Sequence, residues 1–336
     1  MRRSGVSLAE VASLENLTRA FWRAAQGKRE RLDVVRFAAA LDLELAGLGA
    51  AIRDGSVQVG EMHSFEIRDP KRRTIHAPCF RERVLHHALV AQIGPPLDRA
   101  LVDDTFACRR GRGSLAAVMR AQGHLRRADW YVKVDIRGYF SSIDHAVLRA
   151  ALRRKLKDRG VLGLCDRIIA SHAVSPGRGL PIGALTSQHF ANYYLAPLDR
   201  LLLEGLRGDV LGIVRYMDDT IAFCGSRQQA RAILRAIEAC VGERLRLRLR
   251  PPQIQRSERG VSFLGFRVQR SSLRLSRRRR RRYAAARRAL EAAYAAGALA
   301  GHELQAGLGA ALAITAHADA RGWRQAELRR RPAVDA

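Results

Sequence analysis

Two adjacent carboxylates, Asp218 and Asp219, lie between apolar runs that are typical of β-strands. Ile213-Val214 precedes them and Thr220-Ile221-Ala222-Phe223 follows, so the pattern predicts a tight hairpin with acid at its tip. Neighbouring carboxylates repel one another, and a divalent cation is the simplest way to neutralise them. The segment therefore predicts a metal site carried on a β-hairpin.

The charge of the whole chain indicates a polyanionic partner. Its 336 residues include 60 Lys and Arg against 32 Asp and Glu, which gives a formal net charge of +28. Such a balance disfavours an enzyme of small neutral substrates and favours nucleic acid. At roughly 100 to 200 residues per domain, the length predicts two or three subdomains around a large core.

Membrane association and cysteine chemistry are not expected. No stretch approaches the ~18 uninterrupted apolar residues of a spanning helix, and Glu10 and Glu15 follow the N-terminus in place of a secretory apolar core. We therefore expect a cytoplasmic protein with no membrane partner. The five cysteines form no C-x-x-C pair, which argues against a zinc site or a disulfide framework.

Periodicity and breaker residues predict an alternation of helices and strands. Helices are expected within residues 1–60 with a break at Asp54-Gly55, and then at 80–93, 144–156, 187–203 and 227–241. A strand is expected at 64–67, followed by a turn at Asp69-Pro70 and a second extended piece that ends at Pro78. Further strands are expected at 130–136, in the hairpin 210–223, and at 245–249 and 261–266. Gly94-Pro95-Pro96 should stop the 80–93 helix, and Asp144 should cap the next one. An arginine run at 277–282 then opens a basic helical tail to about residue 330.

A third acid makes the hairpin chemically interpretable. Asp135 ends a predicted strand and is followed by Ile136, so it could join Asp218 and Asp219 in one cluster. Three carboxylates can hold two Mg²⁺ ions about 3.5 to 4 Å apart, which is the arrangement that activates a 3′-oxygen and stabilises a departing pyrophosphate. Mn²⁺ is an expected substitute for Mg²⁺.

Several motifs in order then resemble those of reverse transcriptases. They are Asp69-Pro70-Lys71-Arg72-Arg73, Phe80-Arg81-Glu82-Arg83-Val84, Asp135 with Tyr139-Phe140, Gly179 to Gln188, Tyr216-Met217-Asp218-Asp219 and Phe263-Leu264-Gly265-Phe266, spanning about residues 62 to 268. The resemblance implies an α+β right-hand polymerase with fingers, a ferredoxin-like antiparallel palm sheet and a helical thumb. Fingers with N-terminal helices would cover residues 1–128, the palm 129–268 with finger residues of about 150–190 interleaved, and the thumb 269–336.

The same resemblance implies a role for each motif residue. Asp135, Asp218 and Asp219 would be catalytic and would bind metal, with Ile136 in the ligand set and Asp219 secondary. The incoming deoxynucleotide would contact Lys71, Arg73, Tyr139, Ile182 and Gly183, with Tyr139 excluding a 2′-hydroxyl. Template and primer would contact Arg110, Arg112, Gln188, Tyr216, Met217, Phe263, Leu264, Gly265, Arg277 and Arg278. From the residues alone, the Arg110 to Gly113 loop and the arginine run could instead be solvated basic segments.

The Gly179 to Gln188 loop narrows the resemblance. Many reverse transcriptases carry Pro-Gln-Gly here, whereas this chain has Pro181-Ile182-Gly183 and then Ser187-Gln188. Losing a glutamine amide removes a positioning hydrogen bond of about 1 kcal/mol. This form resembles reverse transcriptases of diversity-generating retroelements, which copy a template-repeat RNA with errors at adenines for mutagenic retrohoming and work with a small basic pentameric accessory protein. Neutral drift at Ile182 is the alternative.

Three hypotheses follow for function. The main one is an RNA-directed DNA polymerase of a diversity-generating retroelement that binds RNA template, RNA/DNA duplex and deoxynucleoside triphosphates. The second is a retron, defence-associated or group II intron-type reverse transcriptase. The third is a catalytically silent RNA-binding scaffold, which the presence of all three aspartates disfavours.

Overall fold

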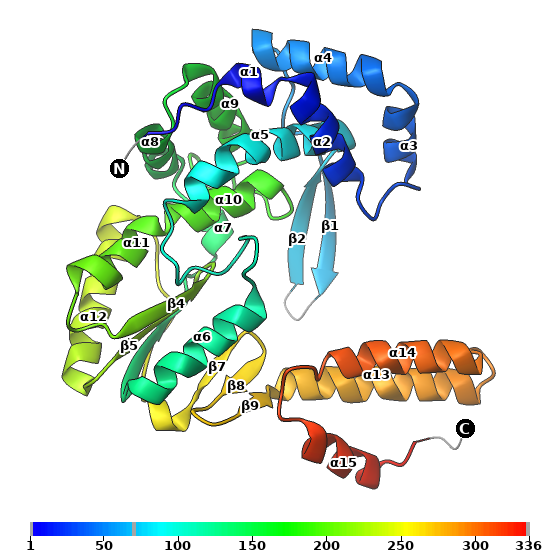
Figure 1. Cartoon of the computed structure of the whole chain (residues 1–336), viewed down its shortest axis with the longest axis vertical. Coiled ribbons are helices and arrows are strands. Elements are labelled where there is room, and N and C mark those ends of the chain that lie inside the picture. The colour runs from blue at the N-terminus through cyan, green and yellow to red at the C-terminus, as the bar shows by residue number, and fades with distance from the viewer. Residues whose placement is uncertain (1–2, 69–71, 334–336) are drawn as a thin grey trace.

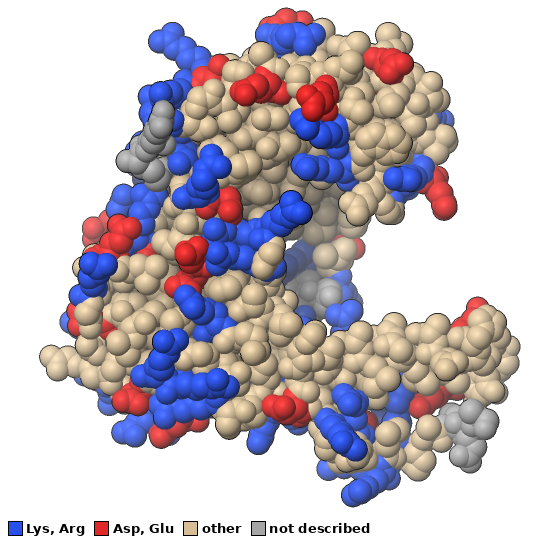
Figure 2. Space-filling model, in the orientation of Figure 1, with Lys and Arg blue, Asp and Glu red and all other residues tan. Residues whose placement is uncertain are grey.

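Figure 1 shows the computed structural model of the chain, which describes residues 3–68 and 72–333. Helices and a two-stranded hairpin form the upper part, a four-stranded sheet with its helices lies below, and C-terminal helices project from the base of the sheet (Figure 1). These parts border a hollow that opens to one side, with Lys and Arg side chains on its rim (Figure 2). The molecule therefore presents an open concave surface.

The N-terminal helices pack on one long helix through aromatic side chains. Phe37 stacks on Phe21 with ring centroids 5.7 Å apart and meets Phe80 edge-on at 5.2 Å. Gly55, with φ 82°, ends the fourth helix, so the predicted break is confirmed. These helices are α1 Leu8–Val11, α2 Leu14–Ala25, α3 Leu32–Ala39, α4 Leu41–Asp54 and α5 Phe80–Asp98.

Helix α5 is longer than predicted. The sequence predicts a stop at Gly94-Pro95-Pro96, but the helix runs on to Asp98. A proline inside a helix removes an N–H donor and crowds a preceding carbonyl, which costs about 3 kcal/mol. Here Ile93 and Leu97 are buried on either side of the prolines, and the N–H of Arg99 donates to the carbonyl of Pro95 at 3.0 Å. The predicted stop was wrong because burial outweighs local preference.

A mostly exposed antiparallel hairpin borders the hollow. Its strands are β1 Met62–Arg68 and β2 Arg72–Pro78, as predicted for the extended pieces on each side of residues 69–71. The predicted turn at Asp69-Pro70 lies outside the described residues. The N–H of His76 in β2 donates to the carbonyl of Ile182 at 2.8 Å, so the Gly179 to Gln188 loop lies against this hairpin.

The central sheet has a ferredoxin-like topology. Its strands β3 Trp130–Val134, β4 Gly212–Tyr216, β5 Asp219–Cys224 and β6 Gln253–Arg256 lie in the order β4-β5-β3-β6, and every pairing is antiparallel. Helices connect β3 to β4 and β5 to β6, which gives the order β-α-β-β-α-β. The predicted α+β right-hand polymerase fold, with a ferredoxin-like palm, is confirmed.

Helices and a second sheet cover the two faces of the palm sheet. Val132, Ile213 and Ala222 face a core shared with the palm helices, whereas Tyr131 and Phe223 face helix α6 (Ser114–Arg127). Asp144 caps α8 by accepting from the N–H of Val147 at 3.1 Å, as predicted. The helices between β3 and β6 are α7 Tyr139–Ser142, α8 His145–Lys155, α9 Arg159–Ala170, α10 Leu185–Tyr194, α11 Ala196–Arg200 and α12 Arg227–Ala239.

The last palm strand is not the one that the sequence predicts. Residues 245–249 were expected to form a strand, but α12 continues into a π-helical turn at Cys240–Arg244 and Arg246 adopts φ 52°. Only Leu249 is bridged to a neighbour, Ile136. The alternating leucines instead fill the core as irregular chain, and β6 follows two prolines with a polar sequence that carries little strand signal.

The C-terminal part is helical, as predicted. Ser276 caps the arginine run by accepting from the N–H of Arg279, so the run forms the first turns of a helix. The elements are β7 Val261–Phe263, β8 Phe266–Val268, β9 Leu273–Leu275, α13 Arg277–Ala295, α14 Gly301–Ala313 and α15 Arg321–Arg330.

Among the described helices, none is long and apolar enough to cross a membrane.

Candidate active site

The β4–β5 hairpin places Asp218 at the tip of a tight turn. Tyr216 pairs with Asp219, which leaves Met217 and Asp218 as the two turn residues. Met217 has φ 54°, a conformation that strains any residue with a side chain. The predicted acidic hairpin is confirmed, and its turn is held in a conformation that the flanking structure must stabilise.

Asp135 and Asp218 come together at the same end of the sheet. Strand β3 pairs with β5, and Val134 lies opposite Thr220, so the residue after Val134 is next to the turn. Burial, together with a hydrogen bond to Asp135 and the negative charge of that residue, raises the pKa of Asp218 to about 7. Among the described residues, the carboxyl group of Asp218 thus lies beside a second acid without a nearby cation that would neutralise it.

Asp219 points to a lysine of the neighbouring strand. Its Oδ2 lies 3.1 Å from the Nζ of Lys133, while its Oδ1 is buried without a hydrogen-bond partner. Burial raises the pKa of Asp219 to about 6, and Lys133 limits the rise. The Nζ of Lys133 also donates to the carbonyl of Ser262 at 2.7 Å and lies over the ring of Phe263. Lys133 thus connects the acidic hairpin to β7.

Asp135 is paired with an arginine from the segment after α12. The Nε of Arg250 lies 3.1 Å from Oδ2 of Asp135, although both side chains are more than 40% exposed. The N–H of Arg250 donates to the carbonyl of Asp135, and that of Arg137 donates to the carbonyl of Arg248. These bonds flank Ile136, so the carbonyl of Ile136 itself takes no part in them.

These donors fit a divalent cation. Within residues 3–68 and 72–333, no three His, Cys, Asp or Glu side chains converge as a ready metal cluster, because Asp219 turns toward Lys133. Mg²⁺ needs only one or two carboxylates and completes its shell with water and substrate phosphates. Asp135 and Asp218 supply that number, and the partnerless Oδ1 of Asp219 is a further oxygen.

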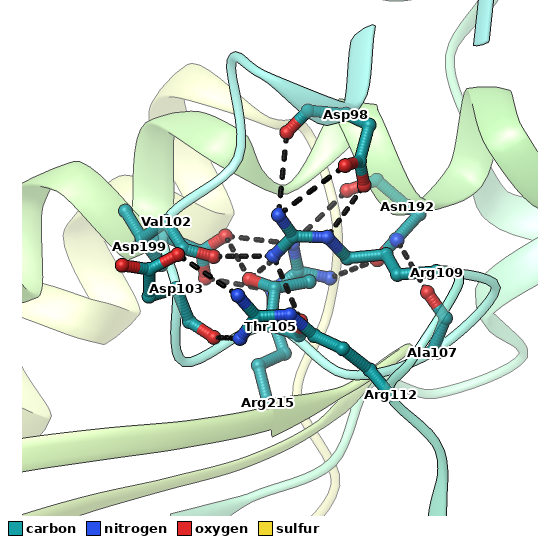
Figure 3. Close-up of polar contacts among 10 residues, drawn as sticks. All are labelled: Asp98, Val102, Asp103, Thr105, Ala107, Arg109, Arg112, Asn192, Asp199 and Arg215. Carbon is teal, nitrogen blue, oxygen red and sulfur yellow. Dashed lines mark hydrogen bonds and ion pairs between the residues drawn. The ribbon is translucent and has the colours of Figure 1, made fainter. Parts of the chain in front are cut away.

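A buried arginine in β4 holds the turn in place through hydrogen bonds. Arg215 precedes Tyr216 and is 0% exposed. Its Nε and Nη2 donate to the two carboxylate oxygens of Asp199 at 2.6 Å each, and its Nη1 donates to Oδ1 of Asn192 at 2.9 Å (Figure 3). The same Nη1 reaches the carbonyl of Met217 at 3.0 Å. One side chain therefore ties the strained turn to α10 and α11.

The same cluster fixes the loop that leads into α6. Thr105 donates to Oδ2 of Asp199 at 3.1 Å (Figure 3). The N–H of Phe106 donates to the carbonyl of Arg215 at 2.9 Å. Arg215 and Asp199 were not among the site residues predicted from the sequence. An available signal was an arginine within the short run Ile213-Val214-Arg215-Tyr216, whose other residues are apolar or aromatic, because a buried charge requires a partner elsewhere in the chain.

The expected nucleotide contacts lie on two neighbouring segments. Arg73 is exposed on β2, and Ile182 is partly exposed on the loop that β2 holds. Gly183 has φ 131°, and a Cβ atom there would lie 2.7 Å from the carbonyl oxygen of His76, so only glycine allows this contact. Lys71, the other basic residue expected here, lies outside the described residues.

Tyr139 does not face the site. Its side chain is 4% exposed, and its hydroxyl donates to the carbonyl of Ala191 in α10. The expectation that Tyr139 contacts the nucleotide and excludes a 2′-hydroxyl is therefore wrong. The short helix α7 turns the Tyr139 ring inward and leaves Phe140 partly exposed.

The expected template contacts near α6 differ in accessibility. Arg110 is exposed, whereas Arg112 donates to Oδ1 of Asp103 at 2.9 Å and lies over the ring of Phe106. Gln188 in α10 is partly buried and accepts a weak hydrogen bond from the thiol of Cys108. Arg110 is thus the basic side chain of this loop that is most open to a ligand.

Of the primer contacts expected at β7 and β8, only those in the turn between the two strands are accessible. Phe263 is 2% exposed and packs in the core, so the expected contact of its side chain with primer is wrong. Leu264 and Gly265 form the partly exposed turn with positive φ, and Arg279 packs against Gly265. Arg277 and Arg278 lie in the first turn of α13, and Tyr216 and Met217 are partly exposed at the hairpin.

The ferredoxin-like sheet, with paired carboxylates at the tip of its central hairpin, defines a nucleic-acid polymerase palm. A family model described as "Reverse transcriptase (RNA-dependent DNA polymerase)" matches residues 67–268, which is more than half of the chain. The chain belongs to the reverse transcriptase family.

Individual relatives are distant and longer. The chain is 24% identical over 163 residues to the group II intron-encoded protein LtrA of Lactococcus lactis subsp. cremoris, covering 46% of this chain and 27% of LtrA. It is 23% identical over 250 residues to protein YkfC of Escherichia coli K12, covering 61% of this chain and 65% of YkfC. The match therefore spans only about a quarter of LtrA and less than two thirds of YkfC.

Two telomerases are among the solved structures that are similar to this chain. A telomerase from Candida tropicalis covers 66% of this chain and 56% of its own at 13% identity, with a TM-score of 0.46. A telomerase from Candida albicans in complex with a fragment of telomeric RNA covers 81% and 54% at 11% identity, with a TM-score of 0.49. The fold assignment above therefore rests on strand order rather than on these neighbours.

Replacing Arg215 should destabilise the whole palm. The variant Arg215→Met leaves the buried carboxylate of Asp199 without its charged partner, which costs about 3 to 5 kcal/mol of unfolding free energy. The double variant Arg215→Met with Asp199→Leu should regain part of that loss. Thermal unfolding measures both, with exposed Arg231→Met as the matched control. If Arg215→Met and Arg231→Met unfold at the same temperature, the buried pair does not have this importance.

Stability should depend on the protonation of Asp218. Its raised pKa means that the folded protein keeps a proton that the unfolded chain releases, so this contribution is complete below about pH 4 and is lost as pH rises through 7. Asp218→Asn should therefore be more stable than the unchanged protein at pH 8, by about 2 kcal/mol after allowance for solvent access.

The same variant tests metal binding without an activity assay. Millimolar Mg²⁺ at pH 8 should raise the unfolding temperature of the unchanged protein and have little effect on Asp218→Asn. The exposed acid Asp42, changed to Asn, is the matched control and should alter neither the pH profile nor the Mg²⁺ response. Equal Mg²⁺ responses in all three proteins would contradict a metal site at the carboxylate pair.

Proposed function

We propose that this chain is an RNA-directed DNA polymerase. The observation that carries the proposal is the pairing of Asp135 with Asp218 at the tip of the palm hairpin, in a member of the reverse transcriptase family. Asp135, Asp218 and the carbonyl of Ile136 would hold two Mg²⁺ ions, with Asp219 as a secondary ligand. When bound, the metals would supply positive charge to the attacking 3′-oxygen and the leaving pyrophosphate.

The other residues of the site would bind and orient the substrates. Arg73, with Lys71, would hold the triphosphate of a deoxynucleotide entering along β2. Ile182 and Gly183 lie on the loop beside that strand and would also contact the nucleotide. Arg110 and the partly exposed turn Leu264-Gly265 would contact template and primer.

The boundaries of the three parts are also a proposal. Residues 1–128 would form fingers with the N-terminal helices, residues 129–268 the palm with interleaved finger residues, and residues 269–336 the thumb. Helix α13 would then present Arg277 and Arg278 to the phosphates of an RNA/DNA duplex. The hollow between the hairpin and the C-terminal helices would be the duplex channel (Figure 2).

Primer extension on an RNA template tests the proposal directly. The unchanged protein with Mg²⁺ should add deoxynucleotides, and Asp218→Ala should lower the rate at least about a hundredfold because it removes a metal ligand. Asp42→Ala, an exposed change of the same type, should extend normally. If the unchanged protein binds RNA but adds no nucleotide, even with its own RNA and an accessory protein, it is a binding scaffold.

Within the family, we propose that the chain is the reverse transcriptase of a diversity-generating retroelement. The support is the Ile182-Gly183 sequence with Ser187-Gln188 in the loop against β2, where an amide would otherwise position the incoming nucleotide. Such an enzyme would copy a template-repeat RNA with errors opposite adenine for mutagenic retrohoming, and would work with a small basic pentameric accessory protein.

A second candidate is a group II intron-type reverse transcriptase. It is favoured by the similarity to LtrA, which is named as an intron-encoded protein. Retron and defence-associated enzymes are further members of this alternative. Flanking DNA separates the candidates, because a template repeat and a small accessory gene accompany only the diversity-generating retroelement.

Fidelity should respond to the side chain at position 182. Ile182→Gln restores an amide that can donate a hydrogen bond of about 1 kcal/mol, so misincorporation opposite template adenine should fall about fivefold. Sequencing of the cDNA products measures this. Val174→Gln, an apolar-to-amide change at an exposed residue shortly before the same loop, is the matched control. Equal error rates in Ile182→Gln and the unchanged protein would remove the proposed role of Ile182.

A further inference from the structure

A cavity of about 460 Å³ lies apart from the carboxylate pair, where the end of α8 meets α11 and the π-helical turn Cys240–Arg244. In Figure 1, α8 and α11 lie along the left edge of the molecule, whereas the hollow opens to the right. We call it the outer palm cavity. Its lining residues are Arg3, Ala151, Arg153, Arg154, Tyr193, Ala196, Pro197, Arg200 and Arg244.

Positive charge in this cavity is not balanced by the protein. The described residues that line the cavity include no Asp or Glu. Arg153 pairs with Asp166 at 3.0 Å. In the part of the chain that the structure describes, Arg154, Arg200 and Arg244 have no carboxylate partner, although arginines gathered in one cavity repel one another. An anionic ligand would remove this repulsion.

A buried lysine adds to the imbalance. Lys155, at the end of α8, is only 7% exposed. Burial and the nearby charges of Arg99 and Arg200 lower its pKa, and no acid offsets them. The cationic groups therefore continue beneath the surface of the cavity, where a bound anion would be less screened by solvent than on an open face.

The cavity is also held in shape by the backbone. The N–H of Ser4 donates to the carbonyl of Lys155 at 2.7 Å, and the N–H of Lys157 returns a bond to Ser4 at 3.1 Å. Arg3 is fixed beside this pairing because its Nη2 donates to the carbonyl of Leu156 at 2.7 Å. Residues far apart in the sequence are thus joined into one preorganised wall, which lowers the entropy cost of binding a ligand.

We propose that the outer palm cavity binds the phosphate backbone of single-stranded RNA, as a second RNA site outside the hollow of the palm. Arginine is the side chain best suited to phosphate oxygens, which it binds through two parallel N–H donors. The lining also includes Ala196, Pro197 and Tyr193, and an unpaired base can stack on guanidinium or aromatic planes. A concave site of this size suits one nucleotide of a flexible strand better than a rigid duplex.

The proposal uses only the membership of the reverse transcriptase family, not the retroelement subtype. A polymerase that copies one segment of a longer RNA must also retain the part that lies outside the channel. A second phosphate site on the far side of the palm would hold that part while the template moves. Its loss should therefore weaken binding of long RNA and spare the chemistry on a short duplex.

Charge reversal in the cavity tests this. The variant Arg154→Glu with Arg244→Glu is compared with Arg231→Glu and Arg235→Glu, two exposed arginines of α12 that give the same change in net charge. Fluorescence anisotropy measures binding of a short RNA/DNA primer–template and of the same duplex with a long single-stranded RNA extension. Primer extension on the short duplex and the unfolding temperature report whether each variant is folded and active.

The cavity variant should lose about tenfold in affinity for the extended probe, and the slope of log affinity against log salt should fall by about 1.4, since two phosphate contacts are removed. Its binding and extension of the short duplex should not change, and the α12 variant should bind both probes normally. The proposal is overturned if the cavity variant binds the extended probe normally, which would indicate another anion such as an acidic protein, or if both variants lose affinity equally. Should charge reversal prevent folding, Arg154→Gln with Arg244→Gln gives the same comparison.

Discussion

The ion pair between Arg215 and Asp199 is the interaction on which the acidic β4–β5 hairpin depends. Neither side chain has any exposure, and burying two charges costs several kcal/mol each unless every polar atom finds a partner. Here the guanidinium meets a carboxylate, an amide oxygen and the carbonyl of Met217, so the cost is offset. The arrangement fixes the position of a turn whose own backbone is strained. Strand, turn and two helices are thereby located relative to one another by one residue.

Above this pair, the three acids of the site are balanced unequally. Asp135 has Arg250 and Asp219 has Lys133, whereas Asp218 faces Asp135, and its pKa is raised further than that of Asp219. A site that is complete in itself would not leave the buried carboxyl of Asp218 without a cationic partner at neutral pH. The imbalance is the physical reason to expect a divalent cation. Lys133 contacts both Asp219 and the carbonyl of Ser262, so it also links the β4–β5 hairpin to β7.

Sequence patterns predicted the parts of this molecule that are governed by local rules. The hairpin strands, the Asp144 cap and the helical tail follow from alternation and capping residues, and they are confirmed. The errors lie where long-range packing decides. Helix α5 passes through two prolines because its flanks are buried, and Tyr139 turns inward because the carbonyl of Ala191 accepts its hydroxyl. Arg215 was missed because its partner lies 16 residues earlier, on a helix whose position no local pattern reveals.

The loop at Ile182 is held against β2 by backbone contacts, not by the side chain of residue 182. It is attached to β2 through the backbone, because the N–H of His76 bonds the carbonyl of Ile182 and Gly183 approaches too closely for any side chain. Neither contact uses the side chain of residue 182, which remains partly exposed. That side chain can therefore change from amide to hydrocarbon with little effect on stability. Under the role proposed for Ile182, the accuracy of copying would then vary while the palm sheet, the carboxylate pair and Arg215 stay the same.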